Sequence, residues 1–460
     1  MRRLRKATMV VWWAAVWWLA VVRNGASAAA GDPWAGVRKI VDGGVSSRVY
    51  PGAAAVVGTK NGIVFEHYAG RQTYGEVPPH STTNQEIGED TIFDLASLSK
   101  VVATTSVVAQ LYENGLIDLG ARVASAELLG EGFASGGKDG VTVEDCLLHQ
   151  AGFPPDPSPN YWDPTFGCRG APLPDSQSFA CSERCYGSLL NQTLDASPGE
   201  RYVYSDLSMI TMMFVAGKVV ESKGLVPESS LLPECSRFPN SVAVQLQCYF
   251  EAYLRTAVVP AIELASGHAA EVFGYRPREE FWELASPTVT VAASKLNVTL
   301  QGRVEDGNAE MLGGVSGHAG VFATSRSVAA LAHSLLFPGL GLSGKPSGYT
   351  FLNKTTVETF TTERDHSISS RALGWNTNDP RTRDEGWNLS CGDLLSPQTF
   401  MHLGYTGTMV CCDPEGEFYT VLLTNRVYPT DQGNGIHDVR RSFGDAAASV
   451  IRSGREEAIL

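Results

Sequence analysis

The chain contains 460 residues, 43% of them hydrophobic and 18% charged, and its formal net charge is −13. This composition is sufficient for a large buried core, while the acidic balance disfavours nucleic acid and anionic lipid as partners. The length alone would allow two or three domains, but the sequence contains neither an evident linker nor an internal repeat.

The first 30 residues have the layout of a secretory signal peptide. An arginine-rich head precedes the apolar run Thr8–Val22, and the small residues Ala26–Ala30 follow, with cleavage expected after Ala28 or Ala30. Cleavage after Ala28 removes five cations and no anions, which makes the formal net charge −18. An uncleaved membrane anchor is the alternative, and no later segment is apolar enough to cross a bilayer. We therefore expect a secreted or periplasmic protein, associated with a membrane only if this segment stays uncleaved.

Nine cysteines are consistent with an exported chain, in which disulfide bonds persist. Five lie in two polar stretches, about 155–200 and 222–250, which we interpret as surface insertions held by disulfides: Cys168, Cys181, Cys185, Cys235 and Cys248. Three others lie in apolar contexts that favour free buried thiols: Cys146, Cys411 and Cys412. No cysteine or histidine pair has zinc-ligand spacing, so we expect neither a metal nor a cofactor. Four glycosylation sequons, relevant only in a host that glycosylates, begin at Asn191, Asn297, Asn353 and Asn388.

The mature chain is expected to open with a short helix, Trp34–Val41, followed by a β-hairpin. Two apolar runs, Gly52–Thr59 and Ile63–Tyr68, are joined by Lys60-Asn61-Gly62. Asn-Gly between two such runs is a strong hairpin signal, because both residues tolerate a positive φ.

The stretch Phe93–Lys100 combines a serine and a lysine at the head of a predicted helix. The next twelve residues, Val101–Tyr112, carry no charge, and Asn114-Gly115 suits a left-handed helix end. Lys100 is therefore a single cation at a buried helix N-terminus, where the dipole and the loss of water both favour the neutral amine. Ser97 lies three residues earlier on the same helix face, so a neutral Lys100 is a plausible base for it. The N–H groups at the helix start would face an oxyanion.

Two other motifs match catalytic patterns less well. Ser135-Gly136-Gly137-Lys138 repeats the Ser-x-x-Lys spacing in a glycine-rich loop, where nothing would hold the two side chains together. Ser316 and His318 lie in the small-residue loop Gly313–Gly320, which lacks the full Gly-x-Ser-x-Gly elbow. We expect neither Ser135 nor Ser316 to be a nucleophile.

The second half supplies further candidate residues and the remaining strands. Tyr204-Ser205-Asp206 precedes the uncharged helix Leu207–Gly217; the tyrosine and the carboxylate suit proton transfer, although Asp206 alone suits a helix cap. A helix is expected to begin near Ser325. The C-terminal elements are two strands and a helix: Met409–Cys412, Phe418–Thr424 and His437–Ile451. Strands at both ends of a helical middle predict a sheet assembled from the two termini.

Three ordered motifs resemble those of the serine β-lactamase-related family, which groups class C β-lactamases, penicillin-binding proteins, D-aminopeptidases and esterases. The resemblance covers about residues 35–455. Its motifs are Ser97-Leu98-Ser99-Lys100, Tyr204-Ser205-Asp206 and His402-Leu403-Gly404, supported by the lesser stretches Cys146–Gly152, Gly313–Phe322 and Leu422–Arg426.

The resemblance implies an α/β (α+β) fold in which a five-stranded antiparallel sheet flanked by helices lies beside a mostly helical lobe, with the site in the cleft between them. Ser97 would attack a carbonyl, and Lys100 and Tyr204 would share its proton. The backbone N–H groups of Ser97 and Tyr405 would form the oxyanion hole, with Asp206, His402 and Gly404 also lining the substrate site.

Two departures from the family pattern affect the expected specificity. Asp206 replaces the commoner asparagine and places a negative charge beside Lys100. Leu403 replaces the commoner threonine or serine of the motif, so a hydroxyl that helps to bind a substrate carboxylate is missing. Aligning Tyr405-Thr406-Gly407 with the motif instead would supply a threonine hydroxyl, but His402 would then fall outside the motif. Keeping His402, we predict better turnover of neutral esters than of cephalosporins.

Two functional hypotheses follow. The first is a secreted serine hydrolase that forms an acyl-enzyme at Ser97 with a small-molecule or peptide ester or amide. The second is a non-catalytic scaffold or binding protein with the same fold, because family resemblance does not fix function.

Overall fold

The computed structural model describes residues 32–168, 177–270, 272–290, 298–383, 389–431 and 435–459. The predicted signal peptide and the sequons at Asn297 and Asn388 lie outside these ranges. Within them, no helix has the length and apolarity needed to cross a membrane.

The largest sheet has six antiparallel strands in the order β2-β1-β11-β10-β9-β8. Its strands are β1 (Gly52–Thr59), β2 (Gly62–Gly70), β8 (Asn376–Thr377), β9 (Phe400–Leu403), β10 (Met409–Asp413) and β11 (Phe418–Thr424). The predicted hairpin, and a sheet built from both termini, are confirmed. The expectation of five strands is wrong by one, because the edge strand β8 is only two residues long and leaves no periodic pattern.

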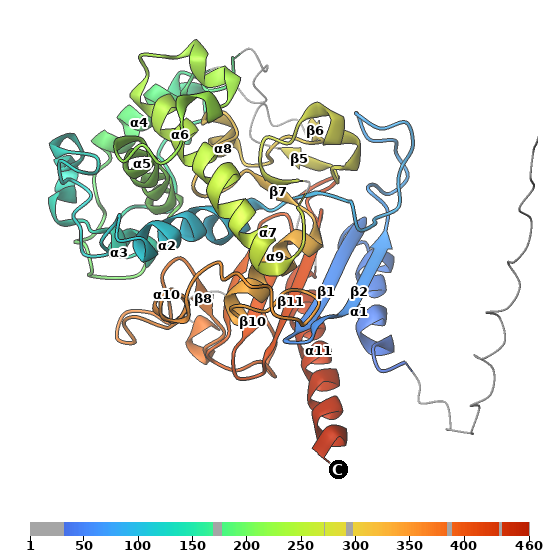
Figure 1. The fold of residues 1–460 in the computed structure, drawn as a ribbon. Helices are drawn as coiled ribbons and strands as arrows, with labels where there is room; N and C mark the ends of the chain where they lie inside the picture. Colours follow the sequence, from blue (N-terminus) through green and yellow to red (C-terminus); the bar gives the residue numbers. More distant parts are fainter. Residues whose placement is uncertain are drawn as a thin grey trace, which may run out of the picture.

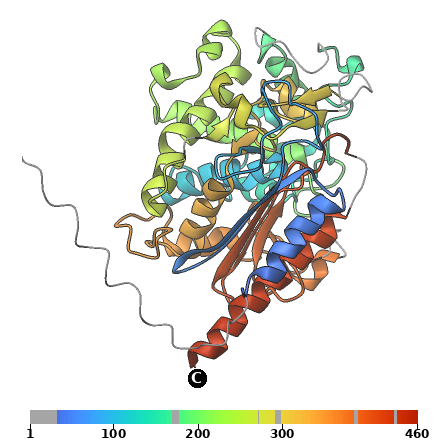
Figure 2. The ribbon, with the colours of Figure 1, turned by 90° about the vertical axis from the view of Figure 1, so that its right-hand side faces the viewer.

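Helices cover both faces of this sheet, so its central strand β11 is buried along its whole length. On one face, α1 (Ala35–Ser46) and α11 (Ile436–Ile459) pack side by side (Figure 2). On the other face, α9 (Ser325–Leu336) packs against β1 and β11, and the helical lobe lies beyond it (Figure 1). The residues of the sheet that face α9 therefore belong to a different apolar cluster from those that face α1 and α11.

The helical lobe is organised around α5 (Asp206–Ser222), which is buried on nearly all sides. It contacts α2 (Ser106–Glu113), α3 (Val143–Leu147) and α6 (Val242–Tyr253). Further helices are α4 (Ser182–Asn191), α7 (Val259–Ser266), α8 (Gly307–Met311) and α10 (Lys354–Thr361). The close crossing of α5 and α6 requires Gly217, where a Cβ would lie 2.0 Å from the Leu246 carbonyl oxygen. The stretch 222–250, predicted as an insertion, includes most of α6, so from Val242 onward it is buried and not a polar surface segment.

Two small sheets connect the lobes. The first has the order β3-β7-β4, from β3 (Phe93–Asp94), β7 (Val321–Ala323) and β4 (Phe273–Tyr275); the second pairs β5 (Thr288–Thr290) with β6 (Val298–Leu300). The β3–β7 pairing continues past the strands, because the Leu95 N–H donates to the Val321 carbonyl. The glycine-rich loop before β7 is thereby held beside Ser97.

Three disulfides join Cys168 to Cys181, Cys235 to Cys248 and Cys391 to Cys411. The first two connect cysteines within the predicted insertions. The prediction that Cys411 is a free thiol is wrong, because its partner Cys391 comes from a turn 20 residues earlier in the chain. The free cysteines, all buried, are Cys146, Cys185 and Cys412.

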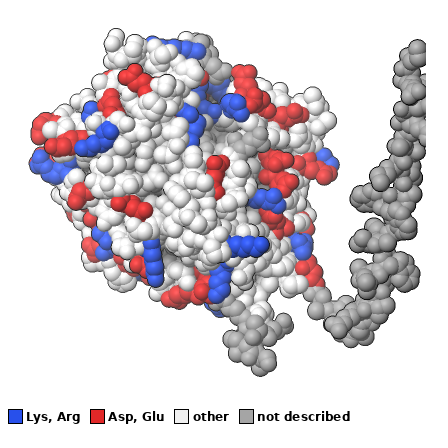
Figure 3. Space-filling view, viewed as in Figure 1, with Lys and Arg blue, Asp and Glu red and all other residues white. Residues whose placement is uncertain are grey.

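Acidic and basic side chains intermingle on the face seen in Figure 3, mainly around its edge, while its centre is mostly uncharged. This face offers no broad basic area of the kind that binds a phosphate backbone.

Candidate active site

Ser97 follows a strained turn that one buried carboxylate holds in place. Ala96 has a φ of 46°, which is unfavourable for a residue with a Cβ. The Asp94 carboxylate accepts hydrogen bonds from the N–H of Ala96 at 2.8 Å and from the N–H of Glu305 at 2.7 Å. The Asp94 carbonyl accepts a further bond from the Thr406 hydroxyl. Asp94 thus ties the Ser97 turn to two distant segments, and burial raises its pKa to about 6.

The helix behind Ser97 is not a regular α-helix. A 3₁₀ turn, Ala96–Leu98, leads into a π-helical segment, Lys100–Thr105, before α2 begins. Within the π segment the Lys100 carbonyl accepts a hydrogen bond from the Thr105 hydroxyl. In a regular α-helix this carbonyl would accept from a backbone N–H. The predicted proximity of Ser97 and Lys100 is nevertheless observed, since Lys100 Nζ lies 2.8 Å from Ser97 Oγ.

Lys100 is fully buried, and its ammonium contacts oxygen atoms from three segments. Besides Ser97, its Nζ donates to the His318 carbonyl at 3.1 Å and lies 2.7 Å from Asp206 Oδ1. Burial opposes the charge, but the Asp206 carboxylate and the Tyr204 phenol outweigh it and raise the pKa of Lys100. The prediction of a neutral resting amine is therefore wrong. That prediction rested on burial and the helix dipole; the opposing charge that the family resemblance implied at Asp206 outweighs both.

Tyr204 lies against Lys100, with the ammonium 4.9 Å from its ring centre. Its hydroxyl is hydrogen-bonded to Lys100 and Ser97. Burial raises the pKa of Tyr204, and the nearby ammonium partly counteracts this. Ser205 caps α5 and donates its N–H to His149 Nδ1 at 3.1 Å, which fixes the segment that carries Tyr204. The structure thus brings the predicted Ser97, Lys100, Tyr204 and Asp206 together.

A buried arginine lies behind Tyr204 and was not identified from the sequence. The guanidinium of Arg371, which is fully buried, lies 5.2 Å from the ring centre of Tyr202 and 5.3 Å from that of Tyr204. Burial, followed by the charge of Arg371, holds the pKa of His149 and of His402 well below the usual range. Both imidazoles are therefore neutral. Nothing in the run Ser369-Ser370-Arg371 distinguishes this arginine from a surface one.

The motif on β9 is only partly as expected. His402 faces Tyr204, with 6.2 Å between the two ring centres, and its Nδ1 donates to the Leu403 carbonyl. Leu403 points the other way, into the apolar cluster under α1 and α11. The interpretation that Leu403 lines the cleft in place of a hydroxyl is therefore wrong. Thr406 is also buried and donates to Asp94, so it does not replace that hydroxyl.

Gly404 and Tyr405 lie beside the Ser97 turn. A Cβ on Gly404 would lie 2.4 Å from the Leu95 carbonyl oxygen, so glycine is required where β9 ends against this turn. Tyr405 is 47% exposed, and its hydroxyl donates to Asp431 at 2.9 Å. Its N–H makes no hydrogen bond to another residue that the structure describes. The backbone of Tyr405 is thus available as a donor, as the oxyanion-hole prediction requires.

Ser316 and His318 form a hydrogen-bonded chain with an unexpected third residue, Asp306. Ser316 Oγ lies 2.8 Å from His318 Nδ1, and His318 Nε2 lies 3.0 Å from Asp306 Oδ1. Burial disfavours the imidazolium, but Asp306 and Asp206 outweigh burial and raise the pKa of His318. A protonated imidazole is no base, and Ser316 is fully buried. The geometry therefore does not suit Ser316 as a nucleophile.

Asp206, Asp306 and His318 are also the three side chains within the described ranges that come close enough together to share a metal ion. The Lys100 ammonium occupies the cation position beside Asp206, at 2.7 Å. Both ring nitrogens of His318 already have hydrogen-bond partners. These groups are better explained as a chain of ion pairs than as a metal site.

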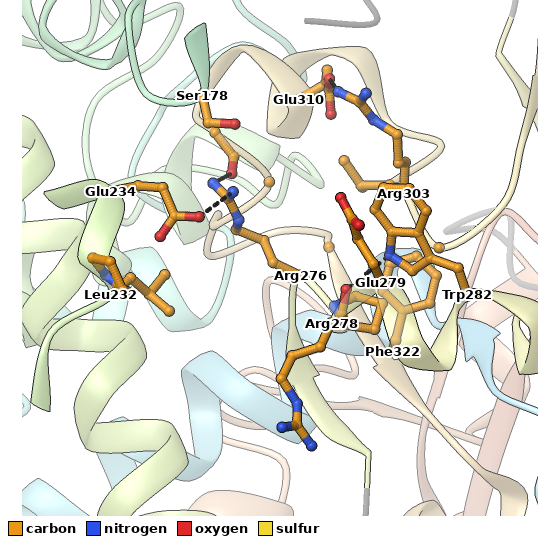
Figure 4. A pocket seen from close by; sticks show the side chains of 17 residues that line it. Ser178, Leu232, Glu234, Arg276, Arg278, Glu279, Trp282, Arg303, Glu310 and Phe322 are labelled. Atoms are coloured by element: carbon orange, nitrogen blue, oxygen red, sulfur yellow. Dashed lines mark hydrogen bonds and ion pairs between the residues drawn. The ribbon is translucent and has the colours of Figure 1, made fainter. Parts of the chain in front are cut away.

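Two other features do not contribute to this site. Lys138 of the second Ser-x-x-Lys sequence is buried, and its amine donates to the carbonyls of Ser135, Leu190 and Gln192. A cavity of about 470 Å³, lined in part by the loop Gly313–Gly320, contains none of the candidate catalytic residues (Figure 4). Arg276 in its wall is paired with Glu234.

Comparison with known proteins supports the resemblance. The chain matches the Beta-lactamase family over residues 37–223 and 265–444. A Salmonella typhi protein named as a candidate D-alanyl-D-alanine carboxypeptidase is 27% identical over 402 residues, covering 84% of this chain and 82% of that protein.

Solved structures share the fold at low identity. A penicillin-binding protein homologue from Caulobacter crescentus has a TM-score of 0.59 and 18% identity, covering 91% of this chain and 98% of that one. A class C β-lactamase from Rhodobacter sphaeroides has a TM-score of 0.57 and 16% identity, covering 91% and 99%. The chain therefore belongs to the Beta-lactamase family of serine hydrolases and has the β-lactamase/transpeptidase-like fold.

Proposed function

We propose that this protein is an exported serine hydrolase that forms an acyl-enzyme at Ser97 with an ester or amide substrate. The observation that carries the proposal is the contact of Ser97 Oγ with Lys100 Nζ at 2.8 Å, with the Tyr204 hydroxyl bonded to both. The family supports the reaction class. The disulfides and the predicted signal peptide support export.

In acylation, Ser97 Oγ attacks the substrate carbonyl carbon, and the bond from that carbon to the leaving nitrogen or oxygen then breaks. The Ser97 proton passes to the Lys100–Tyr204 pair and from there to the leaving group. The N–H groups of Ser97 and Tyr405 stabilise the oxyanion. Water then attacks the acyl carbon, and its proton passes through Tyr204 and Lys100 to Ser97 Oγ as the ester bond to Oγ breaks and the acid is released.

The protonated resting state of Lys100 sets a condition on this sequence. An ammonium cannot accept the Ser97 proton, so the reactive form has a neutral amine at Lys100. Loss of that proton to solvent, against the attraction of the Asp206 carboxylate 2.7 Å away, produces this form. We therefore expect activity that rises with pH.

The substrate is a small-molecule or peptide acyl donor. The carboxypeptidase name of the 27% identical relative favours a peptide that ends in D-amino acids, while the fold alone accommodates esters. With Leu403 outside the cleft, the stated reason for expecting weak cephalosporin turnover no longer applies.

Labelling with a fluorophosphonate probe tests the proposal. The probe should modify wild-type protein, and mass spectrometry should place the adduct on Ser97. Ser97→Ala should abolish labelling with an unchanged melting temperature, whereas the matched control Ser316→Ala should label normally. Absence of an adduct in folded wild-type protein, or an adduct on another serine, would instead favour the non-catalytic scaffold or a different site.

A further inference from the structure

Asp206 creates an electrostatic problem that the proposed mechanism does not by itself solve. Its carboxylate lies 2.7 Å from the Lys100 ammonium and is only 16% exposed. At that separation an opposite charge strongly favours the protonated amine, which is the unreactive form. A neutral residue at position 206 would lack this effect.

His318 is placed to reduce that effect. Its Nε2 lies 4.0 Å from Asp206 Oδ2 and 3.0 Å from Asp306 Oδ1, so one imidazole faces two carboxylates. Its other nitrogen, Nδ1, lies 2.8 Å from the Ser316 hydroxyl, which accepts a hydrogen bond when both nitrogens are protonated. Both ring nitrogens are thus matched to acceptors, as an imidazolium requires.

We propose, building on the serine hydrolase function above, that His318 is a positioning residue: held as a cation by Asp306, it offsets the charge of Asp206 and so lets Lys100 become the base for Ser97. In this arrangement Lys100, Asp206, His318 and Asp306 alternate in sign and are together neutral. Two pKa shifts agree with a charged pair. The pKa of His318 is raised, and the pKa of Asp306 is lowered to about 2 by its imidazolium neighbour despite burial.

Other charged and titratable groups act on the same atoms but do not replace this role. Asp156, beside the start of α5, has an exposed side chain, but partial loss of water around its carboxyl, followed by the charges of Asp206 and Asp306, raises its pKa to about 6. His149 and His402 are neutral. The groups that face Lys100 or His318 are therefore Asp206, Asp306, Asp156, Tyr204, His149, His402 and Ser316.

The role can be separated from simple support of the loop. Lys100 also bonds to His318, but through the backbone carbonyl, and that contact survives any change of side chain. Asp306 caps α8 through a bond from the Ala309 N–H, and asparagine caps as well as aspartate. Asp306→Asn therefore removes the charge that holds His318 protonated without removing the cap.

The experiment measures the rate constant for fluorophosphonate labelling of Ser97 from pH 5 to 10, a range that lies on the rising limb below the raised pKa of Lys100. His318→Gln and Asp306→Asn should each move the rising limb to higher pH by about one unit or more. Without the imidazolium the charge of Asp206 is no longer offset, and an opposite charge as close as Asp206 is to Lys100 raises the pKa of the amine by about that amount. At a fixed pH below the limb, labelling should slow about tenfold. Ser316→Ala removes a neutral acceptor of the same imidazole but no charge, so it should move the limb less than either of these variants.

The outcomes separate the two proposals. No labelling at Ser97 in folded wild-type protein overturns the serine hydrolase function. Normal labelling with an unmoved limb in Asp306→Asn, or a limb that Ser316→Ala moves equally, overturns the role of His318 and leaves that function intact. If His318→Gln does not fold, Asp306→Asn alone decides, because it retains the imidazole and the helix cap.

Discussion

At the scale of single residues, the site depends on charges that compensate one another within a few ångströms. Lys100 is buried and protonated because Asp206 lies 2.7 Å away, and burial, followed by the charge of Arg371, keeps His149 and His402 neutral on the other side of Tyr204. A buried cation with no compensating anion would lose its proton instead. The protonation state of Lys100 is thus determined by a side chain from another element.

Asp206→Asn should shift the activity profile to lower pH. Asparagine is nearly isosteric, and it removes the carboxylate that raises the pKa of Lys100, so the neutral amine appears at lower pH. The pH dependence of kcat/KM for p-nitrophenyl acetate measures this, with the rising limb expected to move down by one unit or more. Asp195→Asn, a change on an exposed loop, is the control. A limb that moves upward would contradict the assignment of Lys100 as the titrating base.

Leu403→Thr should reduce stability without changing specificity. The Leu403 side chain is 7% exposed in the apolar cluster under α1 and α11, so threonine would lose packing and bury a hydroxyl. We expect a loss of about 2–4 kcal/mol in the free energy of unfolding, measured with urea. The ratio of kcat/KM for nitrocefin and p-nitrophenyl acetate should stay unchanged, with Leu403→Met as the stability control. A rise in that ratio would show that the side chain at position 403 contacts the substrate, contrary to this assignment.

At the scale of elements, the reactive serine is held by connections between segments far apart in the chain. The Ser97 turn is strained at Ala96, and such strain persists only where the surroundings hold it. Asp94 provides this support through bonds to the Ala96 and Glu305 amides and to the Thr406 hydroxyl. The position of Ser97 and the strain at Ala96 therefore depend on contacts with the loop before α8 and with the turn after β9.

Asp94→Asn should slow labelling of Ser97 and flatten part of the pH dependence of stability. The amide cannot accept from both the Ala96 and the Glu305 N–H, so we expect a loss of about 1–3 kcal/mol at pH 7. The wild-type carboxyl has a folded pKa of about 6, above its unfolded value of 3.8. The folded state therefore binds the extra proton, and stability from this group falls as pH rises between those values, by on the order of 3 kcal/mol.

Urea unfolding of wild-type and Asp94→Asn protein at pH 4 to 7 measures this slope. Asp90→Asn, a change at an exposed position in the preceding loop, is the matched control and should follow the wild type. An Asp94→Asn slope equal to that of the wild type would show that Asp94 does not titrate in this window.

At the scale of the molecule, the sequence predicted local elements and the order of motifs well, and long-range pairings poorly. The hairpin, β11 and the proximity of Ser97 to Lys100 depend on residues close in the chain, where pattern and spacing suffice. The Ser316–His318–Asp306 chain and the buried Arg371 depend on segments that meet only in the folded protein. Leu403 was assigned to the wrong face because strand alternation beyond His402 was not followed.

The Cys391–Cys411 disulfide was missed for the same reason, since Cys411 and Cys412 look equivalent in the sequence. They are neighbours on β10, so their side chains lie on opposite faces of the sheet, and only Cys411 faces Cys391. The bond closes a loop that contains β9, the strand that carries His402. A crosslink of this kind stabilises mainly by restricting the unfolded chain.

Cys411→Ala should therefore destabilise the oxidised protein by about 2–5 kcal/mol, the usual effect of losing a native disulfide. Cys412→Ala, the matched control on the same strand, removes only a buried thiol and should cost about 1 kcal/mol. Urea unfolding with and without dithiothreitol measures both effects. Reduction should destabilise Cys412→Ala more than Cys411→Ala, because Cys411→Ala lacks one of the three bonds.

Under denaturing, non-reducing conditions, iodoacetamide should modify three cysteines in the wild type and four in Cys411→Ala, the added one being Cys391. A count that does not rise would mean that Cys391 is paired elsewhere or that Cys411 is free.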